Sequence, residues 1–288
     1  MIGDPFPPQP RVTALVAAYN AEEFVVDALR SLAAQTYGNL RVLVSVDRSD
    51  DDTAARCAAF ARHEPRFTVI VQSERLGWIG NARVLLGAAD GELGFFMGHD
   101  DLVEPGYVAR LVTALRDTPG AVLAFSDLEV GNADGRNEIV RYSDLDRVSG
   151  SVERGRRVVA HRRPWWAAYR GLFRVEAARR VGGLRRHLGG EFAADWPFVV
   201  GLALQGECVR VPEVLYRHRY RATSLSRQWR YDNLSWLTAY LSCARTVARA
   251  ELTVRERLVV LAALAGGVCG ALARSLRLSA DPPQEAEG

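Results

Sequence analysis

The first half of this 288-residue chain alternates between two periodicities, and that alternation limits the possible folds more than any other feature. Short apolar runs with the length and valine content of buried strands occur at Val12–Ala18, Leu40–Val46, Phe67–Val71, 93–97 and 121–125. Stretches with helical spacing lie between them, at 22–34, 53–62, 79–89 and 107–115. Strand–helix repetition implies right-handed crossovers. We therefore expect an α/β fold with a mainly parallel central sheet and helices on both faces.

Polar residues follow three of these strands, at the edge of the sheet where ligands bind in such folds. They are Tyr19 and Asn20 after the first strand, Asp47 and the run 48–53 after the second, and His99, Asp100 and Asp101 after the fourth. The carboxylates at 50–52 precede a helix, where N-capping is as good an explanation as ligand binding. The helix after residue 101 has its own start signal at 104–105. Metal or phosphate chemistry therefore explains Asp100 and Asp101 better than capping does.

The alternation stops after about residue 130. The stretch 131–157 is polar and rich in Asp, Arg and Gly, which predicts a long loop or an insertion. In the basic and aromatic cluster that follows, at 162–166, Trp165 and Trp166 are either core residues or a platform for an acceptor sugar. Helices are expected at Val175–Val181, ended by two glycines, and from 191 to 204.

The C-terminal part, from about 227 to 280, predicts a helical extension with helices near 232–249 and 254–276. Residues 258–273 carry no charge but are fewer than the roughly 20 that a membrane span needs. We therefore expect a buried helix or a peripheral contact with a membrane surface. The last residues, 281–288, have the composition of a disordered tail.

Charge and cysteine content restrict partners and compartment. The net charge of +3 gives no support for nucleic acid as a partner. The chain has no lysine, so contacts to phosphate must come from arginine, whose planar fork suits them. The four cysteines form no CxxC pair and the N-terminus does not resemble an export signal, which predicts a cytoplasmic protein, with the inner face of the membrane as an alternative.

Four segments together resemble the family 2 glycosyltransferases, which are inverting enzymes with the nucleotide-diphospho-sugar transferase (GT-A) fold. Residues 12–20 (VTALVAAYN) with 31–37 (SLAAQTY) resemble the opening strand and helix of the family. Residues 47–53 (DRSDDDT) resemble its Asp-Asp-Gly-Ser-x-Asp-Gly-Thr turn, and 98–101 (GHDD) fall on its Asp-x-Asp metal motif. Residues 191–206 (EFAADWPFVVGLALQG) resemble the segment that holds the catalytic base.

The resemblance implies one transferase domain over about 8–226, with a nucleotide-binding half at 8–128 and an acceptor-binding half at 129–226. It implies a nucleotide-sugar donor and a glycan, lipid-linked or small-molecule acceptor. A divalent cation, Mn²⁺ or Mg²⁺, would rest on Asp100 and Asp101, because such ions prefer oxygen ligands and stabilise the departing diphosphate. Asp195 would be the catalytic base. Substrate contacts are expected from Ala17, Tyr19, Asn20, Asp47, Arg83, Asp100, Trp165, Trp166, His218 and Arg221.

Two residues depart from the family pattern. Val46 replaces the first Asp of the turn, and Gly98 replaces the first Asp of the metal motif. We interpret both as variation within an active family. A nucleotidyltransferase of the same fold is an alternative, although its Gly-rich basic loop is absent after the first strand. A second alternative is a non-catalytic sugar-nucleotide or glycan-binding module with a decayed metal site, which Gly98 alone favours.

Overall fold

All five strands expected from the sequence are present in the computed structural model, which describes residues 7–131, 136–160, 164–219, 221 and 224–278, with side chains as far as 269. The strands are β1 Val12–Ala18, β2 Leu40–Val46, β3 Phe67–Val71, β4 Leu93–Gly98, β5 Leu102–Val103, β6 Ala121–Gly131, β7 Asn137–Val140, β8 Leu172–Arg174 and β9 Glu207–Arg219. The helices are α1 Val25–Ala33, α2 Thr53–Ala61, α3 Gly77–Ala88, α4 Tyr107–Asp117, α5 Ser151–Val159, α6 Trp165–Tyr169, α7 Val175–Val181, α8 Asp195–Gln205, α9 Asn233–Arg249 and α10 Val254–Leu278. Two short 3₁₀ helices lie at Ser143–Leu145 (η1) and Leu225–Gln228 (η2).

The strands form one sheet in the order β3-β2-β1-β4-β8-β6-β9-β5, with β7 paired to β6. Neighbours among β1 to β4 are parallel, as the strand–helix repetition predicts, and the long β6 also runs parallel to β9. The short β8 joins these two parallel groups by antiparallel pairs with β4 and β6. The carboxyl ends of β1, β2 and β4 therefore meet at one edge of the sheet.

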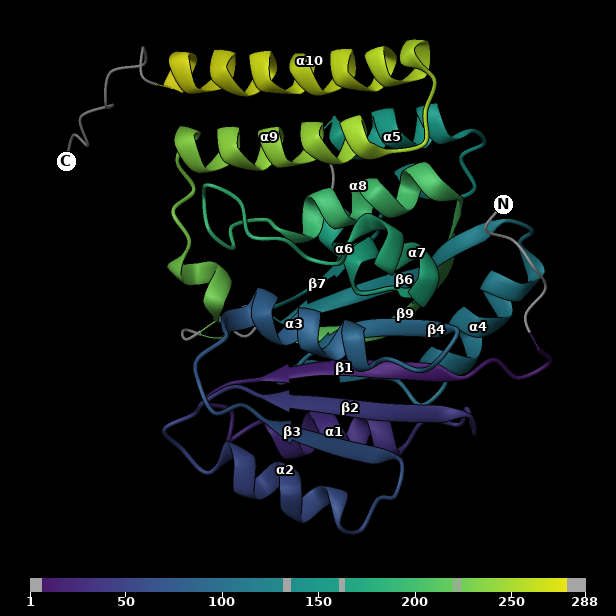
Figure 1. Cartoon of the computed structure of the whole chain (residues 1–288), viewed down its shortest axis with the longest axis vertical. Coiled ribbons are helices and arrows are strands. Elements are labelled where there is room, and N and C mark those ends of the chain that lie inside the picture. Colours follow the sequence, from purple (N-terminus) through teal and green to yellow (C-terminus); the bar gives the residue numbers. More distant parts are fainter. Residues whose placement is uncertain (1–6, 132–135, 161–163, 220, 222–223, 279–288) are drawn as a thin grey trace.

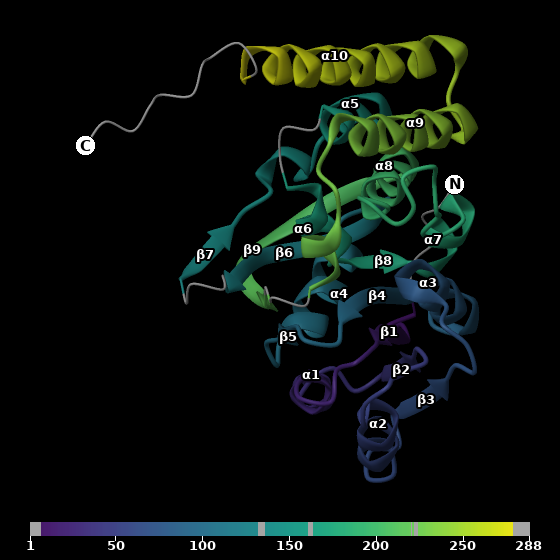
Figure 2. The same cartoon turned by 90° about the vertical axis from the view of Figure 1, so that its left-hand side faces the viewer.

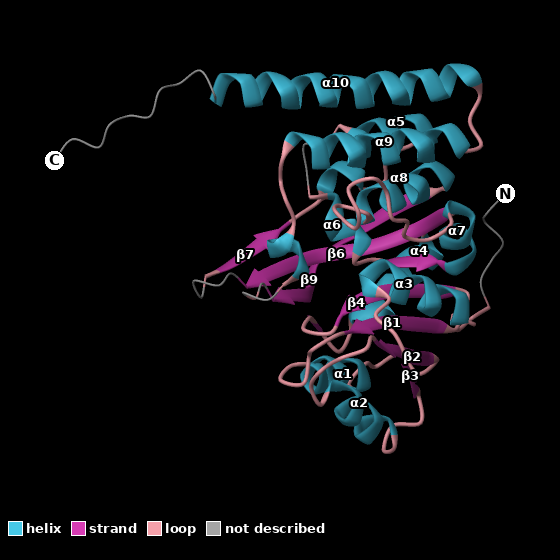
Figure 3. Cartoon of the chain, turned by 60° about the vertical axis from the view of Figure 1, so that its left-hand side comes forward, coloured by secondary structure: helices cyan, strands magenta, loops and turns pink. Residues whose placement is uncertain are grey.

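Helices cover both faces of the sheet (Figures 1 and 2). Helices α1, α2 and α4 lie on one face, while α3, α6, α7 and α8 lie on the other. A further layer of α5 and α9 packs on α8, and α10 packs outside it on α5 and α9, as Figure 3 shows. Helix α8 is therefore enclosed on all sides, and every residue from its start to Leu204 is buried.

Two glycines permit the close packing of this helical layer. A Cβ on Gly201 of α8 would lie 2.7 Å from both γ-methyl groups of Val181, and one on Gly155 of α5 would lie 2.6 Å from Leu204 Cδ2. Carbon atoms do not approach that closely without displacement. The absence of a side chain at these two positions thus sets the distances of α5 and α7 from α8.

The prediction of a long loop or insertion at 131–157 is wrong. The described part of this stretch contains β7, η1 and most of α5. Its arginines obscure an amphipathic helix, since Val158 and Val159 are buried while Arg156 and Arg157 pair with Glu153 on the outer face. The buried Arg154 donates to Ala203 O (2.8 Å), Val148 O (2.9 Å) and Glu207 (2.6 Å), which satisfies its charge inside the core.

The C-terminal extension is the pair of helices that the sequence predicts. Asp232 accepts a bond from Ser235 N (2.8 Å) and caps α9, and Thr253 with Glu256 forms a capping box at the start of α10. Helix α9 buries Ala239, Cys243 and Val247 toward α8. Within the described residues, no helix has both the length and the apolar character that crossing a membrane requires. The predicted tail, 281–288, lies outside the described residues.

Candidate functional site

A cavity of about 860 Å³ lies beyond the carboxyl ends of β1, β2 and β4. Its wall includes residues from both halves of the chain and from the start of the C-terminal extension. Of the residues that the sequence analysis selected, those lining the cavity are Ala17, Tyr19, Asn20, Asp47, Asp100, Asp101, Trp165, Trp166, Asp195, His218 and Arg221. Arg83 is the exception: it is exposed on α3 and does not belong to the lining.

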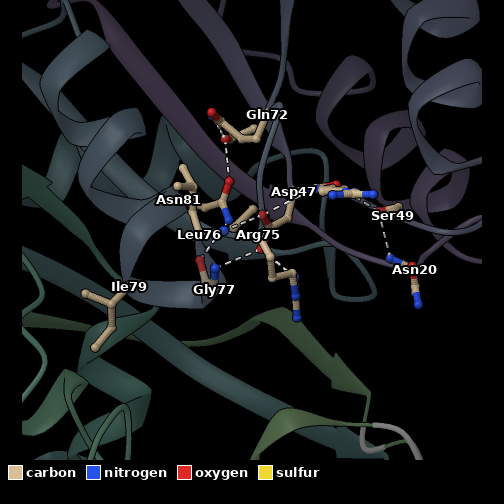
Figure 4. Close-up of polar contacts among 12 residues, drawn as sticks. Asn20, Asp47, Ser49, Gln72, Arg75, Leu76, Gly77, Ile79 and Asn81 are labelled. Carbon is tan, nitrogen blue, oxygen red and sulfur yellow. Dashed lines mark hydrogen bonds and ion pairs between the residues drawn. The ribbon is translucent and has the colours of Figure 1, made fainter.

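Asp47 follows β2 and is buried, and its carboxylate lies on the N-terminus of α3 (Figure 4). Its oxygens accept bonds from the backbone N–H groups of Leu76 (2.8 Å) and Gly77 (2.9 Å), and they pair with the guanidinium of Arg75. Free N–H groups and a positive dipole end make a helix N-terminus a favourable place for a carboxylate. Asp47 therefore fixes the loop between β3 and α3 at the edge of the cavity.

Arg75 is a functional candidate that the sequence analysis missed. Its guanidinium carbon lies 3.1 Å from the centroid of the Tyr19 ring, so the cation stacks on the residue that follows β1. About half of its side chain is exposed, at the cavity wall. The sequence does contain a signal for Arg75. It lies in the loop that follows β3, two residues before the Gly that opens α3, and the loop after a parallel strand is a place where ligands bind.

The loops after β1 and β2 are tied together by side-chain bonds. Asn20, in the left-handed region with φ of 42°, accepts a bond from Asp50 N (3.0 Å) and donates its own N–H to Ser49 Oγ (3.1 Å). Asp51 accepts bonds from Thr53 N and Glu22 N, both at 3.0 Å. Asp51 thus bonds the N–H of the first residue of α2, while Asp52, at the N-cap position itself, makes no side-chain capping bond.

The two adjacent aspartates after β4 differ in their surroundings. Asp101 is fully buried, with Tyr216 Oη at 2.6 Å, His218 Nδ1 at 2.7 Å and Arg219 N at 3.2 Å from its oxygens. Arg170 Nε lies 3.6 Å away. Although burial alone would raise it, the pKa of Asp101 is held well below its usual range by His218, Arg170 and the Tyr216 hydroxyl. Its carboxylate already joins β9 and Arg170 to the end of β4.

Asp100 has fewer protein partners. Its nearest cation is Arg221, with Nε 3.8 Å from Oδ2, and burial together with the charge of Asp101 raises its pKa. The two carboxylates lie over Gly98, where a Cβ would come within 2.8 Å of Asp101 Oδ2 and 3.1 Å of Asp100 Oδ1. The space of the missing first Asp of the motif is therefore filled by the other two.

The residues around Asp100 fit a metal ion only if the substrate supplies most of its ligands. Among the described residues, no group of three or more His, Cys, Asp or Glu side chains is placed to hold a metal. Mg²⁺ commonly binds through one or two carboxylates, with substrate phosphates and water completing the shell. Asp100 alone of the pair retains oxygens without a close protein donor, so it fits that pattern and Asp101 fits a supporting role.

Asp195 is the first residue of α8 and is buried in the cavity wall. Burial raises the pKa of its carboxyl, although the positive charge of Arg170 acts in the opposite direction. A carboxylate that is poorly solvated binds a proton more readily. Asp195 therefore has the environment of a proton acceptor.

Aromatic rings surround Asp195, and the chain places all six of its tryptophans here. Trp78, Trp165, Trp166, Trp229 and Trp236 line the cavity, and Trp196 stacks on Trp165 with ring centroids 5.1 Å apart. The sequence left two interpretations for Trp165 and Trp166, core residues or a platform for an acceptor sugar, and the two residues differ in their surroundings. Trp165 is buried in the core, whereas the partly exposed Trp166 lies 6.2 Å from the His218 ring and can present a flat surface.

The remaining predicted residues, His218 and Arg221, lie at the edge of the cavity. His218 bonds Asp101, and Arg221 lies 3.4 Å above the Phe24 ring. Arg162 and Arg163 of the predicted basic cluster lie outside the described residues. Arg170 was not foreseen, because no local pattern marks it and its partners are distant in the sequence. Glu191, which the sequence offers as the base if Asp195 is not, accepts a bond from Ile79 N at Oε1 (3.2 Å) and is a second carboxylate at the start of α3.

The chain is similar to known proteins in sequence. The family model described as glycosyl transferase family 2 matches residues 13–158, just over half of the chain. The succinoglycan biosynthesis protein ExoO of Rhizobium meliloti is 29% identical over 245 residues, covering 80% of this chain and 66% of that protein. An uncharacterised glycosyltransferase of Haemophilus influenzae is 31% identical over 121 residues, covering 42% of this chain and 38% of that protein. The chain thus spans at most about two thirds of these relatives.

Solved structures share the fold at low sequence identity. TarS 1–349 of S. aureus, in complex with UDP-GlcNAc, superposes with a TM-score of 0.70 at 17% identity, over 89% of this chain and 72% of that chain. The mannosyltransferase PcManGT of Pyrobaculum calidifontis, in complex with GDP-Man and Mn²⁺, gives a TM-score of 0.55 at 17% identity, over 98% of this chain and 84% of that chain. These similarities confirm the expected GT-A fold.

Proposed function

This chain belongs to glycosyltransferase family 2, and on that premise we propose that it transfers a sugar from a nucleotide-diphosphate sugar to an acceptor hydroxyl with inversion. One observation supports the proposal above all others. A single cavity is lined by Asp47, Asp100 and Asp195, and we assign these three carboxylates to holding the nucleotide-binding loop, to metal binding and to proton removal. Each comes from a different element, so the fold has to be complete before they meet.

The donor enters beside the loops after β1 and β2. The solved relatives that hold UDP-GlcNAc and GDP-Man support a nucleotide-diphosphate sugar as the donor here. In our proposal Ala17, Tyr19 and Asn20 contact the nucleotide. Asp47 acts by holding Arg75 and the N-terminus of α3 in place. Arg75 and Arg221 then supply the positive charge that a diphosphate requires, in a chain without lysine.

Asp100 is our proposed ligand for a divalent cation, Mn²⁺ or Mg²⁺, with Asp101 held behind it by Tyr216 and His218. The relative that holds GDP-Man with Mn²⁺ supports this use of a metal. When bound, such a cation stabilises the negative charge that develops on the leaving diphosphate. The protein contributes a rigid carboxylate at the end of β4 and the neighbouring cation of Arg221.

Asp195 is the proposed base. It takes the proton of the acceptor hydroxyl as the acceptor oxygen forms a bond to the anomeric carbon. The bond to the diphosphate breaks on the opposite side of the sugar and the electron pair leaves with the phosphate. A single displacement of this kind inverts the anomeric centre, and no residue of the enzyme forms a covalent intermediate.

The acceptor is proposed to lie against the tryptophans, with Trp166 exposed to the cavity beside His218. Large, rigid aromatic surfaces bind the flat apolar faces of a ligand at low cost in conformational entropy. A glycan, a lipid-linked sugar or a small molecule with an apolar face would each satisfy this surface. We also propose a cytoplasmic location, which the buried free thiols of Cys57, Cys208 and Cys243 suit.

Release of nucleoside diphosphate from a panel of nucleotide sugars, measured with and without Mn²⁺, tests the proposal. We expect Mn²⁺-dependent release with at least one donor. Pyrophosphate formed from a nucleoside triphosphate and a sugar phosphate would instead identify a nucleotidyltransferase. Tight binding of nucleotide sugars with no turnover of any of them, in the presence of varied acceptors, would identify a binding module.

A further inference from the structure

Four exposed leucines form one apolar surface, here called the leucine face: Leu188, Leu234, Leu237 and Leu241. The last three are spaced i, i+3 and i+7 on α9, on the side turned away from the buried Ala239 and Cys243. Their exposed fractions are 69%, 44% and 53%. Single exposed leucines are ordinary, but a row along one helix face indicates a surface that something covers.

Leu188 is the most exposed of the four, at 90%, and a fixed turn holds it. His187 N donates to Gly190 O (3.1 Å) and Gly190 N donates back to His187 O (2.8 Å). Gly189 lies against α9, because a Cβ there would be 2.3 Å from Thr238 Oγ1. The turn thus presents an uncovered leucine beside the row on α9, although the backbone around it is well bonded.

A cluster of four arginines borders this surface: Arg83, Arg185, Arg245 and Arg249. All four are exposed, and no described carboxylate forms an ion pair with any of them. Arg245 and Arg249 lie one turn apart on α9. Partial burial, followed by the charges of Arg249, Arg245 and Arg83, lowers the pKa of Arg185, so these three cations lie close enough to repel its charge. Uncompensated positive charge beside an apolar surface matches an anionic partner.

The surface reaches the mouth of the cavity. Leu225 and Tyr231 are exposed, line the cavity, and precede α9 in the chain. Arg83 lies on α3, whose first turn lines the cavity on the other side. In Figures 1 and 2, α9, the loop before α8 and α3 follow one another down the same side of the molecule.

We propose that the leucine face and the arginine cluster together dock on an anionic lipid surface and hold the mouth of the cavity against it. Apolar side chains that enter the interfacial region, with arginines at the level of the headgroups, are the combination that binds peripheral proteins to such membranes. The proposal rests on the proposed function only in what it implies for the acceptor, which would be a lipid-linked sugar presented at the membrane. Binding itself requires no turnover.

Sedimentation of the full chain with vesicles tests the docking surface. We expect binding to phosphatidylcholine vesicles that contain about one third phosphatidylglycerol, and much weaker binding to phosphatidylcholine alone. Leu188→Asp with Leu237→Asp should reduce the partition coefficient by at least about tenfold. Arg245→Gln with Arg249→Gln should reduce it roughly tenfold to thirtyfold on the anionic vesicles and should weaken its dependence on salt.

Two matched controls make the result specific. Leu258→Asp places an aspartate at a leucine of α10 whose exposed fraction, 61%, lies between those of Leu237 and Leu188, and Arg56→Gln with Arg62→Gln removes the same charge from α2 and the residue that follows it. Both should bind like the parent protein. Donor hydrolysis without vesicles and thermal melting should be unchanged in every variant, which separates this proposal from the transferase proposal.

Three results would overturn the docking surface. The first is no binding of the parent protein to anionic vesicles. The second is loss of binding in Leu258→Asp while Leu237→Asp still binds, which would assign the contact to α10. The third is dissociation of a dimer by Leu188→Asp with Leu237→Asp in light scattering, which would make a second copy the partner.

Discussion

Asp100 and Asp101 are neighbours in the sequence, yet their carboxylates meet opposite environments. Tyr216, His218 and Arg170 lower the pKa of Asp101, while burial and the charge of Asp101 raise that of Asp100. A motif read from the sequence gives both residues the same role. At the scale of single residues, the contacts of each carboxylate distinguish Asp101, which bonds other elements of the fold, from Asp100, which faces the cavity with few protein partners.

Asp100→Asn and Asp101→Asn should therefore differ in their effects. Asp100→Asn should keep or slightly raise the melting temperature and remove the effect of Mn²⁺ on nucleoside diphosphate affinity. Asp101→Asn should cost about 2 to 4 kcal/mol of stability, because it leaves buried donors around a weaker acceptor. Thermal melting and calorimetric titration would measure both. The reverse pattern would make Asp101 the metal ligand.

Asp195→Asn should leave donor affinity almost unchanged and lower the transfer rate by about 10²- to 10⁴-fold, because the change removes the proton acceptor and keeps the shape. Glu191→Gln is the matched control, since the Glu191 carboxylate bonds Ile79 N and Arg186 rather than standing free. Steady-state kinetics with separate variation of donor and acceptor would show whether kcat falls while the KM for the donor is unchanged. Transfer at the parent rate in Asp195→Asn would exclude it as the base.

The raised pKa of Asp195 predicts the acid side of the pH profile. The base acts only when ionised, so kcat should fall as pH falls through the raised pKa, at a pH above the ordinary value of 3.8. The effect on folding stability has the opposite pH dependence. The raised pKa favours the folded state at pH values below the ordinary pKa, and this contribution to stability is lost as pH rises through the raised pKa. The acid limb of kcat should disappear from the residual activity of Asp195→Asn. A limb that persists there belongs to another group.

The candidate site was predictable where it lies directly after a strand. Asp47, Asp100 and Tyr19 were found because the ends of buried parallel strands meet at one edge. Arg170 could not be found in that way, because its position depends on packing between segments far apart in the sequence. Arg83 lies outside the lining of the cavity, since helical spacing alone does not tell which side of α3 faces the cavity.

At the scale of elements, β1, β2, β3 and α7 have the bounds expected from the sequence. Buried parallel strands give continuous apolar runs, and paired glycines end α7, so local chemistry was sufficient there. Helix α5 was missed because four of its nine residues are arginine or glutamate, so its composition is typical of a loop. Its apolar face appears only when the spacing of the apolar residues is considered. Tertiary packing on α8 decides its conformation.

Gly201→Ala should destabilise the protein by about 1 to 3 kcal/mol, because the new methyl group would clash with Val181 between α8 and α7. Gly87→Ala on α3 is the matched control. A Cβ there has no heavy atom within 4 Å, and alanine is the better helix former, so stability should rise by up to about 1 kcal/mol. Chemical denaturation would measure both. A neutral Gly201→Ala would mean that α7 can move freely away from α8.

At the scale of the whole molecule, the C-terminal extension packs on the rest of the chain and contributes to the wall of the cavity. Trp229 and Trp236 line the cavity, and α9 covers α8 with the buried Tyr240, Cys243 and Val247. The boundary near residue 226, drawn from the sequence, follows the family resemblance and separates these residues from the site that they complete. We propose that the functional unit extends at least through α9.

Truncation after Arg230 should therefore yield an insoluble or inactive chain, because it uncovers the apolar surface of α8 and removes Trp236 from the cavity. The lost burial is comparable with the roughly 5 to 15 kcal/mol of total stability of a domain. Truncation after Leu252, which removes α10 alone, should be milder and should retain nucleotide binding. Soluble expression and nucleotide affinity of both would be compared. A soluble, fully active chain ending at 230 would show that α9 is dispensable.

Because all six tryptophans lie around one cavity, they also determine the intrinsic fluorescence of this protein. Indole emission depends on the polarity and motion of its surroundings, and here every emitter lies on or directly behind the wall of a single site. Excitation near the red edge of protein absorbance should therefore report on that site alone, without a label. Occupation by a nucleotide, an acceptor or a lipid surface would each change a different subset of the rings, so the spectrum itself can tell one ligand from another.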